Sequence, residues 1–209
     1  NSFTSAGQTV TVGGAANART ITWTGVTNNP TFAGTAALNV YGSFTLASGM
    51  TRTFTGTINF LATSIGNTVT LVGKTLQSAV TFNGAGGGWT LQDNFNDGTA
   101  TITLTAGSLN TNGQTVTCGI FASSNSNIRT LTLGTSAINC SGSGTAWNFT
   151  TVTNLTLNAA SSTITLNGPA VTFQGGAKTY GTVILSGSGT ASIFGVNTFG
   201  NLTRTGTAV

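Results

Sequence analysis

The stretch from Asn139 to Leu185 uses three short pieces in a fixed order: Trp147-Asn148-Phe149, Leu155-Thr156-Leu157 and Thr163-Ile164-Thr165-Leu166. The first two pieces then recur as Val171-Thr172-Phe173 and Val183-Ile184-Leu185. The cycle therefore consists of an aromatic-tipped piece, an aliphatic alternation and a Thr-rich piece that ends in a Gly turn. Because a cycle of this kind is the sequence signature of stacked repeats, it predicts a solenoid.

The same cycle can be followed through the whole chain of 209 residues, which we interpret as a single domain. The spacing predicts a parallel β-helix with three strands per coil and about six to seven coils. In such a stack each coil lies about 4.8 Å above the last, so equivalent side chains form columns. One interior column is expected to contain Phe32, Phe60, Leu91, Phe121, Phe149, Phe173 and Phe194.

The composition supports an all-β fold. The chain is 38% hydrophobic and contains 30 glycines, while only 4% of its residues are charged. This mixture, rich also in Thr, favours strands and tight turns over helices. An antiparallel β-sandwich is the alternative, because turns at short regular spacing fit it as well. The fixed order of three distinguishable pieces favours the β-helix.

Charge and hydropathy exclude two classes of partner. The basic residues are scattered singly along the chain, whereas binding to nucleic acid needs them gathered on one face. They are Arg19, Arg52, Lys74, Arg129, Lys178 and Arg204. There is no apolar run near 18 residues, so no membrane span is expected. The chain starts at Asn1 and ends in the rhythm of the repeat without a polar cap, which predicts a segment of a longer polypeptide.

Two cysteines occupy the same position of the Thr-rich piece in successive cycles. If the register is right, Cys118 and Cys140 stack one above the other, within reach of a disulfide. Two reduced thiols packed as small apolar residues are the alternative, and the sequence leaves both open. Because two thiols without any His are too few ligands, we expect no metal site.

The only acidic residues, Asp93 and Asp97, flank one loop. Two carboxylates could serve glycoside hydrolysis or help to bind Ca²⁺. Asx residues in a turn that ends in Gly98 are more often there for turn geometry. With no His and no Glu there is little material for general acid–base catalysis. We therefore expect neither catalytic residues nor a cofactor.

Alternating Thr-x-Thr pairs, which can order water on a flat solenoid face, occur six times. They are Thr9/Thr11, Thr20/Thr22, Thr53/Thr55, Thr101/Thr103, Thr130/Thr132 and Thr163/Thr165. These pairs fall in different pieces of the cycle and should lie on different faces. That distribution makes an ice-binding protein the less favoured function.

The short coils Thr163-Ile-Thr-Leu-Asn-Gly168 and Asn154-Leu-Thr-Leu157 resemble the parallel β-helix segments of phage tail fibres and bacterial surface adhesins. The resemblance implies a structural or receptor-binding segment of a bacteriophage fibre, extracellular or on the virion surface. The alternative that it implies is a bacterial adhesin or filament subunit. Self-association, as a trimer or a filament, and contact with cell-surface glycan are the partners that follow from it.

Overall fold

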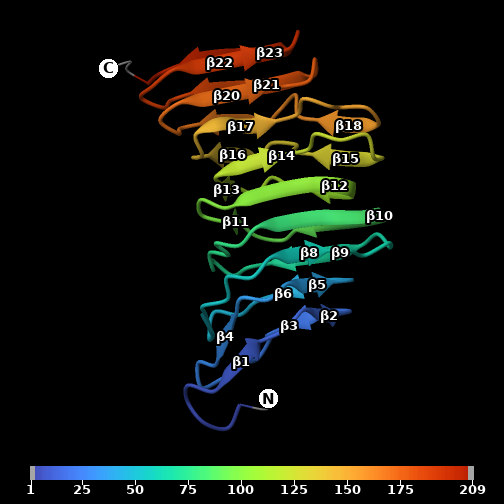
Figure 1. Ribbon diagram of the computed structural model, residues 1–209, viewed down its shortest axis with the longest axis vertical. Coiled ribbons are helices and arrows are strands. Elements are labelled where there is room, and N and C mark those ends of the chain that lie inside the picture. The colour runs from blue at the N-terminus through green and yellow to red at the C-terminus, as the bar shows by residue number, and fades with distance from the viewer. Residues whose placement is uncertain (1–2, 207–209) are drawn as a thin grey trace.

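A computed structural model describes residues 3–206 of the chain as a parallel β-helix of about nine turns, without helices. The turns stack into a rod whose first and last turns lie at opposite ends (Figure 1). At about 4.8 Å per turn the rod is roughly 40 Å long. All strand pairs in these residues are parallel, which confirms the β-helix and excludes the antiparallel sandwich. There are more turns than the six to seven expected.

Each turn visits three faces in the same order, here called A, B and C. Face A consists of β1 (Thr9–Val12), β4 (Thr31–Gly34), β7 (Thr51–Arg52), β11 (Phe95–Asn96), β13 (Val116–Cys118), β16 (Ala137–Cys140), β19 (Thr163–Leu166), β21 (Thr179–Leu185) and β23 (Thr198–Arg204). Its first three strands and its last six are separate sheets, and the single bridge between Thr75 and Asn96 lies between them.

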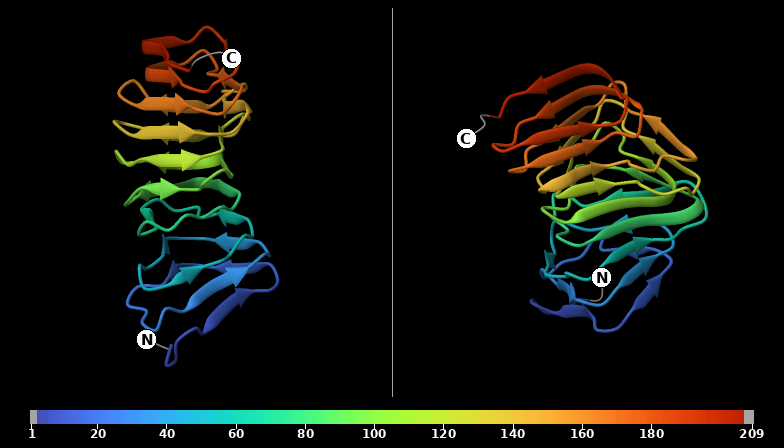
Figure 2. Two further views of the ribbon diagram at one scale, coloured as in Figure 1. Left: turned by 90° about the vertical axis from the view of Figure 1, so that its left-hand side faces the viewer. Right: turned by 45° about the horizontal axis from the view of Figure 1, so that its top comes forward.

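Face B is the longest uninterrupted path. It runs through β2 (Ala16–Ala18), β5 (Leu38–Val40), β8 (Ile58–Phe60), the first half of β10 (Val80–Leu91), the first half of β12 (Thr101–Asn110), β14 (Ile120–Ala122), β17 (Gly144–Asn148), β20 (Val171–Gln174) and β22 (Ala191–Phe194). Face C runs through β3 (Ile21–Thr22), β6 (Phe44–Thr45), β9 (Asn67–Thr70), the second halves of β10 and β12, β15 (Arg129–Thr132) and β18 (Leu155–Asn158). The two long strands β10 and β12 bend around the corner between faces B and C without a break (Figure 2).

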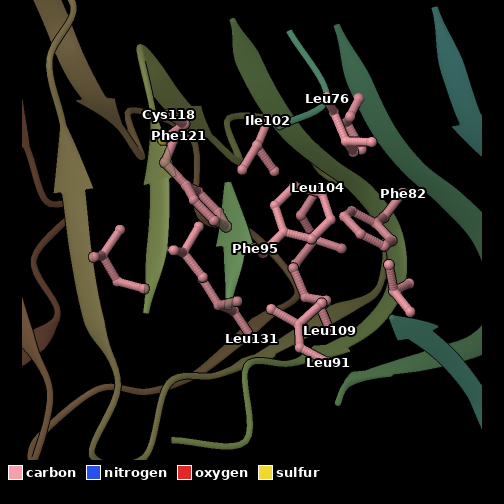
Figure 3. Close-up of a cluster of buried hydrophobic side chains, with 14 of the residues drawn as sticks. Leu76, Phe82, Leu91, Phe95, Ile102, Leu104, Leu109, Cys118, Phe121 and Leu131 are labelled. Atoms are coloured by element: carbon pink, nitrogen blue, oxygen red, sulfur yellow. The ribbon is translucent and has the colours of Figure 1, made fainter. Parts of the chain in front are cut away.

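The alternation of the sequence explains which side chains enter the core. Along β19, Ile164 and Leu166 are buried while the two threonines lie partly exposed. Apolar residues of the three faces meet in the interior, as the close-up of Phe95 from face A, Phe82 from face B and Leu131 from face C shows (Figure 3). Rings on successive turns stack directly, with 4.7 Å between the ring centroids of Phe60 and Phe82. Such contacts add burial and offset stacking turn by turn.

The predicted aromatic positions do not form one column. Phe32 lies on face A, Phe60 on face B and Leu91 on face C, while Phe194 is 57% exposed. The column that does pass through face B contains, in register, Leu38, Ile58, Val80, Ile102, Phe121, Trp147 and Phe173. The three pieces of the cycle have similar alternation, so their phase cannot be read from ring positions alone. A turn also varies in length, from 19 residues between Thr163 and Thr182 to 26 between Ala137 and Thr163.

Candidate functional site

The two cysteines are register partners on face A. Cys118 of β13 pairs with Cys140 of β16, and their Sγ atoms lie 3.7 Å apart. Both are free thiols and both are fully buried. The hydrogen bond with Cys140, together with burial, raises the pKa of the Cys118 thiol. The pair is therefore packed as part of the core, in the reduced form.

The two aspartates do not face each other. Asp93 caps the preceding turn, where its carboxylate accepts hydrogen bonds from the backbone N–H groups of Leu71 and Val72. Asp97 lies inside the solenoid with no exposed surface, and its Oδ1 accepts the N–H of Ser78. Burial raises the pKa of Asp97 to about 7, an effect that this hydrogen bond and the nearby Arg52 guanidinium partly oppose. Because Asp97 has no exposed surface, the two carboxylates do not form the solvent-accessible pair that glycoside hydrolysis needs.

The basic side chains connect successive turns. Arg52 donates to the carbonyl of Thr75 and to the hydroxyl of Ser78, one turn ahead. Lys74 donates to the carbonyls of Ser48 and Met50, one turn behind. Lys178 and Arg204 likewise donate to carbonyls of the preceding turn, whereas Arg19 lies exposed. Carbonyls at the corners lie outside the regular ladders, and these cations satisfy them.

Arg129 is the strongest example, because it is a guanidinium with only 1% of its surface exposed. Its Nε donates to the hydroxyl of Ser123 at 2.7 Å, and its two terminal nitrogens donate to four backbone carbonyls. These carbonyls belong to Ser123, Asn127, Thr151 and Thr153. All five donors are used, so the side chain fixes the loop at 123–128 to the loop at 151–153 of the next turn.

A hollow of about 650 Å³ lies at the corner between faces B and C. Its lining consists of Asn83, Ala85, Gly86, Ala106, Ser126, Asn127 and Ile128. A smaller hollow of about 170 Å³ adjoins it and shares Gly86 and Ile128. Together they form one trough, here called the corner trough, whose floor is the bend of β10 and β12 and whose wall is the loop at 123–128.

Glycines make the floor of the corner trough possible. Four residues of β10, Gly84 to Gly87, lie opposite the single Gly107 of β12. A Cβ at either Gly84 or Gly87 would lie 1.8 Å from the carbonyl oxygen of Ala62, and one at Gly107 would lie 2.3 Å from the carbonyl oxygen of Gly84. The turns therefore approach each other more closely here than side chains would allow, and the extra residues of β10 form a bulge at this corner.

The corner trough is the feature that the sequence-based interpretation missed. Its signal is the run Gly84-Ala-Gly-Gly-Gly88 inside an otherwise alternating strand, a pattern that indicates a bulge or a close approach of backbone. The six Thr pairs lie on all three faces: Thr9/Thr11 belong to face A, Thr101/Thr103 to face B and Thr130/Thr132 to face C. They do not form one flat array.

Comparisons of the chain with protein-family models, with curated proteins and with solved structures find no match. What is established is therefore the class that the fold defines, a parallel β-solenoid repeat protein. In residues 3–206 no group of three or more His, Cys, Asp or Glu side chains is placed to hold a metal ion. The same residues contain no helix long and apolar enough to cross a membrane.

Proposed function

We propose that the chain is a structural, non-enzymatic segment of an extracellular fibre, of the type found in bacteriophage tail fibres. The observation that supports this role most directly is that the charged side chains bind to neighbouring turns of the rod. Five of the six cations and both carboxylates make hydrogen bonds to an adjacent turn, so the ionisable groups serve the stack. The uninterrupted parallel ladder of face B and the apolar interior are features that a mechanical rod requires.

The first and last described turns carry exposed apolar residues. Val10 in the first turn and Leu202 in the last pair in register with the buried residues Phe32 and Val183, yet they are 43% and 46% exposed. Phe194 and Val196 are also exposed near the last turn. An uncovered apolar column with unpaired strand edges favours end-to-end contact with another β-structure. In a longer chain a further turn would cover these surfaces, and in a trimeric or filamentous fibre a neighbouring subunit would cover them.

The experiment that tests the proposal is a native measurement of the source material. The intact mass of the polypeptide that carries this segment is determined, its stoichiometry is measured by sedimentation, and antibodies against residues 3–206 are applied to virions and to uninfected cells. Labelled virions and an oligomeric longer chain are expected. Labelled cell surfaces would favour the alternative, a bacterial adhesin or filament subunit. A lone monomer of 20.9 kDa would overturn both.

A further inference from the structure

The corner trough has the size of a ligand site and a rigid frame. Its main hollow of about 650 Å³ falls within the range of about 300–1,000 Å³ that is typical of small-ligand pockets. The wall is held by the five hydrogen bonds of Arg129, and Asn127 itself donates to the carbonyl of Thr105 on the floor. On the opposite side, Asn67 donates to the carbonyls of Ser64 and Gly88 and so fixes the loop that carries Ile65. The frame is therefore formed before any ligand arrives.

The lining selects against charged ligands. The residues around the main hollow include no ionisable side chain. Arg129 adjoins the smaller hollow, but all of its donors are already bound to carbonyls and to Ser123. A phosphate, carboxylate or sulfate group would lose its water here without gaining a cation. The occupant must therefore be neutral.

The strands of the floor select against an added peptide strand. An extended peptide that joins a sheet needs an unpaired strand edge. β10 is paired on one side with β8 and β9 and on the other with β12, and β12 is paired in turn with β14 and β15. These pairs lie on either side of the bend. At the bend itself, the carbonyls of Leu104 and Thr105 accept hydrogen bonds from the side chains of Ser123 and Asn127. The edge of β12 that faces the loop at 123–128 is therefore already bound, so side chains and turn backbone must make the contacts.

The remaining chemistry is a mixture of hydrogen-bonding and apolar groups. Asn83, Ser126 and Asn127 present amide and hydroxyl groups at exposed positions, and Ala85 and Ile128 present aliphatic surface. Ile128 is 80% exposed and Ile65, beside Gly88, is 79% exposed. A ligand with hydroxyl groups on its edge and C–H groups on its faces satisfies both kinds of surface. We propose that the corner trough binds a neutral saccharide chain.

The proposal is tested by nuclear magnetic resonance titration of the labelled chain with uncharged hexasaccharides, cellohexaose, maltohexaose and xylohexaose, and with hexagalacturonate as the acidic counterpart. At least one neutral sugar is expected to shift the amide signals of Gly86, Ser126 and Asn127. Asn83→Ala and Ile128→Ala should each weaken that binding by about five- to tenfold, the equivalent of about one hydrogen bond or a small apolar contact. Asn201→Ala, an exposed position on β23, is the matched control and should change nothing.

Shifts centred on other residues, a preference for hexagalacturonate, or no shift with any neutral sugar at millimolar concentration would each overturn the proposal. The inference does not rest on the fibre role. If the chain proves to be a secreted monomer that binds a saccharide, the fibre proposal fails and the saccharide proposal holds. If the chain proves to be a virion fibre whose corner trough binds none of these sugars, only the saccharide proposal fails.

Discussion

Cys118 and Cys140 occupy the same position in successive turns, and their Sγ atoms lie 3.7 Å apart in the core. Thiol reagents react with the thiolate, and the raised pKa of Cys118 and the burial of both side chains keep that form scarce and inaccessible. The reduced native protein is therefore expected to show no fast reaction with an aromatic disulfide reagent at pH 8. Both thiols should react once the chain is unfolded in guanidinium chloride.

The control for this prediction is Cys118→Ala, in which one thiol per chain should react with the reagent after unfolding and none should react before. A rapid reaction of both thiols in the native protein would contradict the packing of this pair in the core. It would mean that face A opens between β13 and β16 on the time scale of the assay.

The buried carboxyl of Asp97 predicts that the protein is more stable in mild acid than at neutral pH. Its pKa is raised from 3.8 to about 7 in the folded state, so between these values the folded chain binds more protons than the unfolded chain. The free energy of unfolding should then fall as the pH rises from about 4 to about 7, by at most about 4 kcal/mol. Denaturant titrations across this range measure the slope.

Asp97→Asn keeps an oxygen that can accept the Ser78 N–H and removes the titration. The variant should stay within about 1 kcal/mol of the wild type at pH 4, where Asp97 is neutral in the folded state, and should exceed it at pH 8. The charged Arg52 guanidinium is the other group that acts on this carboxyl, and its own pKa is lowered to about 10 mainly by burial. A wild-type stability that rises between pH 4 and pH 7 would refute the assignment.

The glycine floor of the corner trough predicts a sharp difference between two alanine substitutions. Gly84→Ala places a methyl group against the carbonyl oxygen of Ala62 and should lower the free energy of unfolding by about 2 kcal/mol or more, because the adjacent turns must separate. Gly13→Ala adds a methyl group to open space at a backbone position that needs no positive φ. It should be neutral or slightly stabilising. Equal effects of the two substitutions in thermal unfolding would show that the turns are not closely packed at this corner.

How much of this structure the sequence reveals depends on what kind of interaction is involved. The return of short alternating pieces in a fixed order identified the parallel β-helix. One assignment within that cycle was wrong, because the piece at 183–185 pairs with Thr163–Leu166 on face A and not with the piece at 155–157 on face C. The phase of the cycle was not recoverable, since Phe32 and Phe60 look alike in sequence but lie on different faces. Corner loops differ in length from turn to turn, and this changes which face a given piece of the repeat occupies. The loops are polar, so the pattern of apolar residues does not reveal the change.

The environment of Arg129 shows the same limit for polar groups. Nothing in its neighbourhood distinguishes it from the exposed Arg19, because its partners are carbonyls contributed by two different turns. The Gly84–Gly88 run, by contrast, is a signal in the sequence that the interpretation above did not use. It indicates close backbone approach, although the hollow that results depends on the neighbouring loop at 123–128.

Arg129→Met should weaken the connection between the loops at 123–128 and 151–153, which would then rest on the hydrogen bonds of Thr151 with Ser124 and Asn125. The substitution removes the guanidinium donor from the hydroxyl of Ser123 and from four carbonyls, of which that of Thr151 keeps the N–H of Asn125. A buried acceptor that loses its partner costs about 1–3 kcal/mol. Because water can reach some of these groups once the loops separate, we expect a total loss of about 3–5 kcal/mol. Amide hydrogen exchange should become faster in both loops and should change little elsewhere in the rod.

Arg19→Met removes an exposed cation and is the matched control, with a change in the free energy of unfolding within about 0.5 kcal/mol. If the two variants lose stability equally, the five hydrogen bonds of Arg129 do not hold the wall of the corner trough, and the rigid frame required for saccharide binding is absent.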